Sequence, residues 1–297
     1  MRVYHEHTRS TLSIRDLSWN APGTRIACAL SDKLVRVWNP EKPEIRYSTE
    51  LKGHGQAVAA VVWDPLHSDI LSSCSADQAL RVWDYRAKTC QGTVYTNGEN
   101  VAHAWSPDGS TIAVASRDQK VHFVDVKTWK MVSHEVPDAV NAMEFGHAGD
   151  CLLMATASGR VLIYAFPEMV EVHSVEAHAS AAHCLALDPR GVHLAVGGSD
   201  AVVGLWDTQD WICVRTLRGM DSPIRSVDFS FDGAYIVAGS EDLHCKDLEI
   251  NHVDTGEHVH TISTNHPVTK AKWHPHRYWL AYSGDPTGMK VVQLPNQ

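Results

Sequence analysis

The sequence predicts an all-β fold, a closed ring of seven four-stranded sheets, and three observations lead to this prediction. A short segment of alternating apolar residues recurs along the chain, each copy ends in a large apolar residue, and each is followed by a polar turn and two further strand-like runs. No segment shows a convincing helical periodicity. Repeats of this kind are typical of a β-propeller, in which each repeat forms one blade.

The first element of the repeat is the alternating segment, as in AAVVWDP and VAHAWSPDG. Its copies recur every 40 to 45 residues or so, about the length of a four-stranded blade. The large residues that end the seven copies are Trp19, Trp63, Trp105, Phe145, Leu187, Phe229 and Trp273. Because these copies cover nearly the whole chain, we expect residues 1–297 to form a single seven-bladed propeller.

Two further strands follow in each repeat. The second is a run of small and β-branched residues, such as Ile112 to Ala115, which suits the crowded inner part of a propeller where the blades converge. The third follows a tight turn that contains aspartate. The intervals Asp32 to Trp38, Asp77 to Trp83 and Asp200 to Trp206 are equal, so the same turn is reused.

The last repeat predicts how the ring closes. Its apolar strands, Val268 to Trp273, Trp279 to Tyr282 and Met289 to Leu294, leave no sequence for an outermost strand. Residues Arg2 to His7 precede the first repeat and can supply that strand. We therefore expect an N-terminal strand to pair with the last blade, which would remove an exposed sheet edge.

His54, Ser73, Asp77 and Trp83 of the second repeat hold the residue types of a hydrolytic triad, but we interpret them as structural. The arrangement resembles the WD repeat, in which a histidine before the first strand, a hydroxyl on the second, the turn aspartate and a tryptophan on the third form a buried hydrogen-bond chain. The fifth repeat keeps His178, Asp200 and Trp206 but has Val196 in place of the hydroxyl. A catalytic group would not be rebuilt piecemeal around a ring.

Two repeats depart from this pattern. The third keeps Asp118 but ends its third strand at Val124, and the sixth keeps Asp242 but has no tryptophan. We expect these blades to depend on apolar packing and to open more easily. The segment from Asp242 to Gly256 is longer than its counterparts, and we expect a bulge or extended loop there.

The charge, the cysteine pattern and the lack of long apolar runs limit the partners and compartments that we expect for this protein. The formal net charge is −9, which would on average repel a nucleic-acid backbone, so any RNA role is expected to be indirect. The seven cysteines form no CxxC pair, which favours a reducing compartment. No secretory signal and no run of about 18 to 20 apolar residues is present, so we expect a soluble intracellular protein with no membrane contact.

Metal and cofactor sites are not predicted. The pairs His5/His7, His258/His260 and His274/His276 could each contribute two ligands, but no third or fourth ligand follows at a recognisable spacing. Gly197 and Gly198 are not part of a phosphate-binding motif. We therefore expect no cofactor, no small-molecule substrate and no enzymatic activity.

Two groups of residues are candidates for partner binding. Trp129 and Trp211 follow third strands, where they either stand exposed as interface anchors or pack against an outer strand. The second group precedes the turn aspartates and is expected on one rim of the ring. Its members are Ser31, Ala76, Arg117, Ser199 and Glu241.

Three longer segments are more particular than the general repeat. They are Asn97 to Val114, followed by FVDVKTW; Ala177 to Asp207; and CVRTLRGMDSPIRSVDFSFDG. These segments resemble the third blade, the fifth blade and the passage into the sixth blade of the THO complex subunit 3 family, and the likeness runs from about Ser18 to Leu294.

The resemblance implies a subunit of the nuclear THO assembly, within the larger TREX machinery for messenger-RNA packaging and export. It implies a scaffold that contacts partner subunits with long helical segments. The alternative is a different adaptor, such as a histone-peptide reader or the substrate receptor of a ubiquitin ligase. That alternative would need exposed aromatic or basic residues around the channel mouth.

Overall fold

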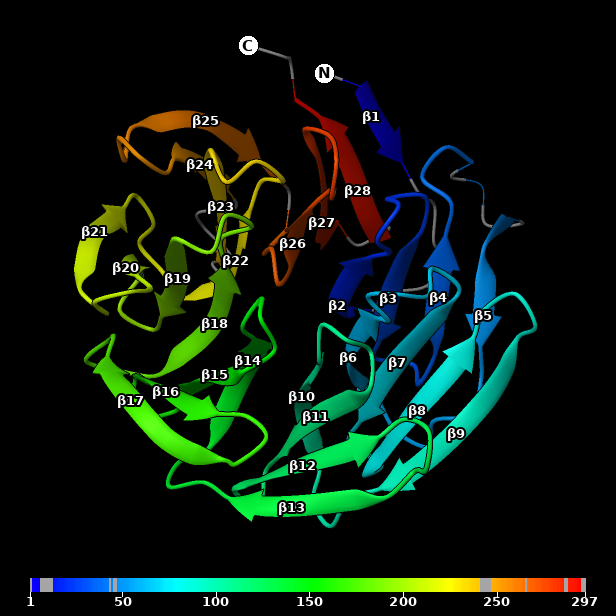
Figure 1. Ribbon diagram of the computed structural model, residues 1–297. Helices are drawn as coiled ribbons and strands as arrows, with labels where there is room; N and C mark the ends of the chain where they lie inside the picture. The colour runs from blue at the N-terminus through cyan, green and yellow to red at the C-terminus, as the bar shows by residue number, and fades with distance from the viewer. Residues whose placement is uncertain are drawn as a thin grey trace.

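The computed structural model describes residues 2–5, 13–42, 44, 47–240, 247–264, 266–285 and 288–294. These residues form seven antiparallel four-stranded sheets arranged as blades around a central axis (Figure 1). The predicted seven-bladed β-propeller is therefore confirmed. We number the blades one to seven in the order of their innermost strands.

Each blade holds four strands. The innermost strands are β2 (Ile14–Trp19), β6 (Val58–Trp63), β10 (Asn100–Trp105), β14 (Val140–Phe145), β18 (Ala182–Leu187), β22 (Ile224–Phe229) and β26 (Ala271–Trp273). The second strands are β3 (Ile26–Leu30), β7 (Ile70–Ser75), β11 (Thr111–Ser116), β15 (Cys151–Thr156), β19 (His193–Gly198), β23 (Tyr235–Ser240) and β27 (Trp279–Asp285). The third strands are β4 (Val35–Trp38), β8 (Ala79–Asp84), β12 (Lys120–Asp125), β16 (Arg160–Ala165), β20 (Val202–Asp207), β24 (Asp247–His252) and β28 (Gly288–Gln293). The outer strands are β5 (Thr49–Leu51), β9 (Thr89–Tyr95), β13 (Met131–Glu135), β17 (Val170–Glu176), β21 (Cys213–Arg218), β25 (His258–Ser263) and β1 (Arg2–His5).

The large apolar residues that define the repeat all end an innermost strand, from Trp19 of β2 to Trp273 of β26. A tight turn follows each of them. In blade three the backbone N–H of Gly109 returns to the carbonyl of Ser106 at 2.9 Å, and Gly109 has a φ of 66°, a conformation that favours glycine. The sequence SPDG therefore stops one strand and starts the next.

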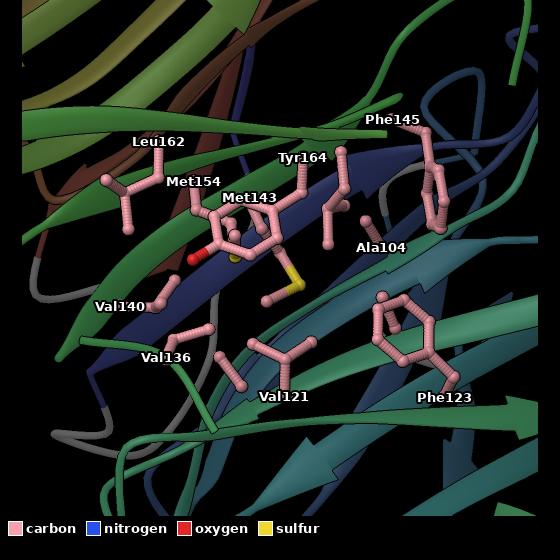
Figure 2. Packing of buried hydrophobic residues seen from close by; sticks show 13 residues of the cluster. Ala104, Val121, Phe123, Val136, Val140, Met143, Phe145, Met154, Leu162 and Tyr164 are labelled. Carbon is pink, nitrogen blue, oxygen red and sulfur yellow. The ribbon is translucent and has the colours of Figure 1, made fainter. Parts of the chain in front are cut away.

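The hydrophobic core is divided among the seams between neighbouring blades. Seven clusters of buried side chains occur in the described residues, and each contains side chains from two adjacent blades. Figure 2 shows the seam between blades three and four, where Phe123 of β12 and Met143 of β14 lie among the buried side chains. One face of every sheet is thus covered by the blade before it and the other by the blade after it.

Ring closure follows the prediction from the sequence. Strand β1 pairs antiparallel with β28, with Arg2 opposite Gln293 and His5 opposite Lys290, so both ends of the chain belong to blade seven (Figure 1). Across the next seam the indole Nε1–H of Trp19 donates to the carbonyl of Lys272 at 3.1 Å. Blade one is thereby joined to blade seven.

The sixth repeat is longer between its second and third strands. Strand β23 ends at Ser240 and β24 begins at Asp247, so the extra residues fall within 241–246, outside the described residues. A register shift does occur at Ile250/Asn251, between β24 and β25. Similar shifts occur between the third and outer strands of blades two, four and five, so this shift is not peculiar to blade six.

Deletion of about ten N-terminal residues should lower the melting temperature by roughly 5–10 °C, because β28 would become an exposed edge and blade seven would lose its outer strand. The measurement is thermal unfolding followed by circular dichroism. A melting temperature equal to that of the full chain would contradict closure by β1.

Candidate functional site

The polar network of blade two connects four side chains. The Nδ1 atom of His54 lies 3.0 Å from the Asp77 carboxylate, and its Nε2 atom lies 2.8 Å from the hydroxyl oxygen of Ser73. The indole N–H of Trp83 donates to the same hydroxyl oxygen at 2.8 Å. The Asp77 carboxylate also accepts the backbone N–H groups of Gly55 and Ala79.

These contacts assign a proton to each position. An ionised Asp77 only accepts, so His54 donates from Nδ1, and the Ser73 hydroxyl is free to donate to Nε2 while it accepts from Trp83. Burial lowers the pKa of His54, against the pull of Asp77 that raises it, and this favours the same neutral imidazole. Ser73 has no exposed surface, so its oxygen is enclosed by the hydrogen-bond chain and is not presented to a substrate.

Blade five holds an incomplete version of this network. The Nδ1 atom of His178 lies 2.9 Å from the Asp200 carboxylate, but its Nε2 atom faces the backbone carbonyl of Val196 at 3.1 Å. Both neighbours are acceptors, so a neutral imidazole can donate to only one of them. The Nε1–H of Trp206 is buried with no partner among the described residues and lies over Gly204, where an added Cβ would come within 2.8 Å of it.

Val196→Thr should therefore be tolerated unusually well, because the new hydroxyl would lie next to His178 and could donate to it. Val35→Thr on β4 is the control, since Val35 has no exposed surface and stands opposite Ala29 and Leu51, whose side chains offer a hydroxyl no hydrogen-bond partner. We expect Val35→Thr to cost roughly 1–3 kcal/mol in the free energy of unfolding and Val196→Thr to cost at least about 1 kcal/mol less. Denaturant unfolding measures both, and equal losses would contradict this account of blade five.

Blade three contains a polar network that was missed at the sequence level. The hydroxyl of Ser116 donates to Asp118 and lies 2.9 Å from Nε2 of His122, whose Nδ1 atom lies 2.7 Å from the hydroxyl of Ser133. His122 has no exposed surface. Blade three therefore has a buried polar network in addition to the apolar packing expected from the sequence. The histidine that blade two takes from the preceding loop is supplied here by the third strand itself.

A second buried histidine lies between blades two and three. The Nε2 atom of His103 is 2.8 Å from the hydroxyl of Ser72, which also accepts the indole N–H of Trp105 at 2.6 Å. Burial lowers the pKa of His103 to about 4. The side chain is therefore neutral in the folded protein at neutral pH.

This burial predicts a loss of stability in acid. Between a pKa of about 4 in the folded state and 6.5 in the unfolded state, the unfolded chain binds one more proton at His103, so stability falls as the pH drops through this range. The full effect is roughly 3 kcal/mol at pH 4. In denaturant unfolding between pH 7 and 4.5, His103→Asn should lose stability less steeply than the parent protein. His258→Asn, which removes an exposed histidine, should keep the parent slope, and an unchanged slope in His103→Asn would contradict the assignment.

The central channel has a volume of about 540 Å³ and is lined by the innermost strands. Three carboxylates line or adjoin it, and each accepts a backbone N–H of the next blade. Asp16 binds the N–H of Val61 at 3.0 Å, Glu144 that of Leu187 at 3.1 Å, and Asp228 that of Trp273 at 2.7 Å. The inner edge of each innermost strand has no fifth strand to pair with, so these carboxylates satisfy donors that the sheet leaves open.

Two lysines accompany these carboxylates. The Nζ atom of Lys272 lies 2.7 Å from Asp228, and that of Lys270 lies 3.5 Å from Asp16. Burial disfavours the charge of Lys272, but the Asp228 and Glu144 carboxylates outweigh it and raise the pKa of this lysine. Burial also raises the pKa of Glu144. The charged wall of the channel therefore consists of groups that are engaged with one another and with the backbone.

The structure places the four described rim candidates on one face of the ring. Ser31, Ala76, Arg117 and Ser199 all occupy turns between second and third strands. Arg117 is exposed and forms an ion pair with Glu99 at 3.1 Å, whereas the Ser199 hydroxyl lies 2.6 Å from Nε2 of His183. Glu241 lies outside the described residues.

Trp129 and Trp211 are half-buried, and of the two alternatives left open by the sequence both pack against an outer strand. The Trp129 ring covers Gly92 of β9, where an added Cβ would come within 2.2 Å of it. The Trp211 ring stacks on His173 of β17, with centroids 6.0 Å apart. Each side chain fills the outer part of a seam, because the turn that carries it folds back onto the preceding blade.

No group of three or more histidine, cysteine, aspartate or glutamate side chains in the described part of the chain is arranged to hold a metal ion. Among the histidine pairs, the Nδ1 atom of His274 accepts the backbone N–H of His276, and the Nε2 atom of His258 lies 2.8 Å from the hydroxyl of Thr261. A search of the same residues finds no helix with the length and apolar character needed to cross a membrane.

Comparison with known proteins places the chain in a family. The family model described as "WD domain, G-beta repeat" matches residues 1–39, 46–84, 88–125, 169–207 and 211–246. The "THO complex subunit 3" of Arabidopsis thaliana is 34% identical over 287 residues, which cover 96% of this chain and 89% of that protein. The chain belongs to the THO complex subunit 3 family of WD-repeat proteins.

Two other WD-repeat relatives are longer than the present THO complex subunit 3 family chain, which spans about 60% of their length. The "WD repeat-containing protein AAC3" of Dictyostelium discoideum is 34% identical over 294 residues, covering 90% of this chain and 60% of that protein. The "Nuclear distribution protein PAC1" of Arthroderma otae is 25% identical over 299 residues, covering 97% and 59%. The solved β-propeller domain of Cps50 (Swd1) from Myceliophteria thermophila has a TM-score of 0.86 at 19% identity, covers 95% of this chain and 97% of that chain, and supports the fold alone.

Proposed function

We propose that this chain is a non-catalytic scaffold subunit of a nuclear THO complex, in which it helps to couple transcription to the processing and export of messenger RNA. The observation that carries the proposal is the 34% identity with a THO complex subunit 3 along nearly the full length of both proteins. The proposal fits a ring whose buried histidines, serines and aspartates hydrogen-bond to one another and to the backbone. Their role is then architectural.

The proposed binding surface is the face formed by the turns between second and third strands. Ring closure holds these turns in fixed relative positions, so several partners can bind side by side to one rigid surface. We place Ser31, Ala76, Arg117, Ser199 and Glu241 at this interface and expect the partners to be THO subunits with long helical segments. With a net charge of −9 the chain is expected to reach RNA through those partners.

The test is purification of the tagged chain from nuclear extract, with identification of the chains that co-elute. We expect THO subunits, and we expect the double variant Arg117→Glu, Glu241→Arg to recover about tenfold less of them, because charge reversal at a rim opposes docking. The melting temperature should stay within about 2 °C of the parent, since Arg117 is exposed and substitutions at exposed positions change stability little.

Arg86→Glu is the matched control. Like Arg117, Arg86 is exposed and paired with a carboxylate, Asp69 at 3.0 Å, but it lies in a turn between third and outer strands, at the opposite end of the blade. Full recovery of THO subunits by the double variant would exclude this rim. Recovery of histones or ubiquitin-ligase subunits in place of THO subunits would favour a different adaptor.

A further inference from the structure

The central channel opens on the face that carries the rim residues, and this opening is called the mouth below. The backbone N–H of Ser31 donates to the carbonyl of Ser13 at 3.1 Å, and that of Ser199 donates to the carbonyl of Ala181 at 2.9 Å. Each of these carbonyls belongs to the residue just before an innermost strand. The innermost strands therefore begin on the rim face, and their first residues surround the mouth.

Three basic side chains line the channel close to the mouth. Arg15 is the second residue of β2, Arg225 is the second residue of β22, and Lys270 directly precedes β26. They belong to blades one, six and seven, which are neighbours in the ring. The blades are joined beside them, because the Asp16 carboxylate lies 3.5 Å from Nζ of Lys270 and the Ser226 hydroxyl accepts a backbone N–H of blade seven at 2.9 Å. The three side chains therefore share one side of the channel.

The charge of Arg15 is not balanced by a carboxylate. Lys270 is paired with Asp16, whereas the exposed guanidinium of Arg15 forms no ion pair with a residue that the structure describes. The rim aspartates Asp77 and Asp200 do not line the channel, and each is bound to a histidine. The mouth therefore presents positive charge in a chain whose net charge is −9, and such a site attracts anions.

A hydrogen-bond chain adds an uncharged donor on the same face. Nη1 of Arg225 lies 3.0 Å from Nδ1 of His183, and Nε2 of His183 lies 2.6 Å from the hydroxyl oxygen of Ser199. A guanidinium only donates, so Nδ1 accepts and a neutral His183 donates from Nε2 to Ser199. The hydrogen of the Ser199 hydroxyl has no acceptor among the described residues. The charge of Arg225 polarises this chain and strengthens the hydroxyl as a donor.

The opposite end of the channel has a different charge. Glu144 and Asp228 directly precede the large residues that end β14 and β22, and Lys272 has the same position in β26. When both carboxylates are ionised, they outnumber the ammonium group among these three side chains. An anion is therefore attracted at the mouth and repelled at the far end, so a polyanionic strand is disfavoured from passing through the channel.

We propose that the mouth of the channel binds a phosphate monoester, with Arg15 and Arg225 as charged donors and the Ser199 hydroxyl as an uncharged donor. A phosphate monoester has a charge of about −1.5 to −2 at pH 7 and three strong acceptor oxygens, so it can accept from donors on several blades at once. The channel has a volume of about 540 Å³, which is large enough for a phosphorylated side chain or a small phosphorylated molecule. The inference does not depend on the proposed function.

The test is isothermal titration calorimetry on the full chain at about pH 7.5 and low salt, where surface charges are screened least. The probe is a short peptide of glycines around one phosphoserine, and we expect it to bind with a dissociation constant of about 1 mM or tighter. The unphosphorylated peptide and the methyl phosphodiester of the same peptide should bind at least about tenfold more weakly, because they carry less negative charge.

Inorganic phosphate distinguishes the two sources of a phosphate group. Inorganic phosphate that binds as tightly as the phosphopeptide identifies a free small molecule as the ligand. Binding of the phosphopeptide that is several-fold tighter identifies a phosphorylated segment of a protein. Both results support the site.

Arg15→Gln should weaken binding of the phosphopeptide by about tenfold, because it removes a charged donor, and Ser199→Ala should weaken it several-fold. Ser199→Thr keeps the hydroxyl and should keep the affinity. Arg15 is exposed, so Arg15→Gln should keep the melting temperature within about 2 °C of the parent. Arg86→Gln is the matched control, since it removes the same charge from an exposed arginine at the opposite end of a blade and should bind as the parent does.

The proposal fails if the phosphopeptide produces no saturable heat, if the unphosphorylated peptide binds equally well, or if Arg15→Gln binds with the affinity of the parent. Displacement of the phosphopeptide by a single-stranded oligouridylate would assign the mouth to RNA and would also overturn the proposal. All of these measurements use the purified chain, so failure of this site is distinguishable from failure to co-purify THO subunits.

Discussion

The burial of each sheet between its two neighbours is the constraint on which the rest of the structure depends. A four-stranded blade has two apolar faces and cannot cover either by itself, and the seven buried clusters accordingly lie between blades. Every blade needs a neighbour on both sides, so all the apolar faces of the seven blades are covered only when the blades close into a ring. The pairing of β1 with β28 meets this need, because it combines the two ends of the chain in one sheet.

The positions and partners of the buried polar side chains follow from the same constraint. The inner edge of each innermost strand faces the channel, where no further strand can accept its donors, and side chains from the adjacent blade take that place in three seams. The buried histidines lie in blades or seams where each has a hydroxyl, a carboxylate or a carbonyl within reach. An unpaired buried donor destabilises the fold whichever residue carries it, so the stability depends on each donor having an acceptor. Blade three can therefore use His122 where blade two uses His54.

Much of the architecture could be predicted because it repeats. Seven large residues at regular intervals identified the ends of the seven innermost strands, and the missing outer strand of the last repeat identified β1 as its source. The network of His54, Ser73, Asp77 and Trp83 was also suggested by residue type and spacing. The spacing can be recognised in the sequence because the alternation of the strands and the turn residues recur within each repeat.

Contacts between repeats could not be predicted in the same way. Whether Trp129 and Trp211 are exposed depends on the outer strand of the preceding blade, and the role of His122 depends on a serine of the adjacent strand. The sequence by itself determined the number of blades, their strands and the way the ring closes, because these follow from periodicity within one repeat. Only the tertiary structure decided which side chains are covered and which donors are satisfied, because the atoms that cover or satisfy them belong to another strand or another blade.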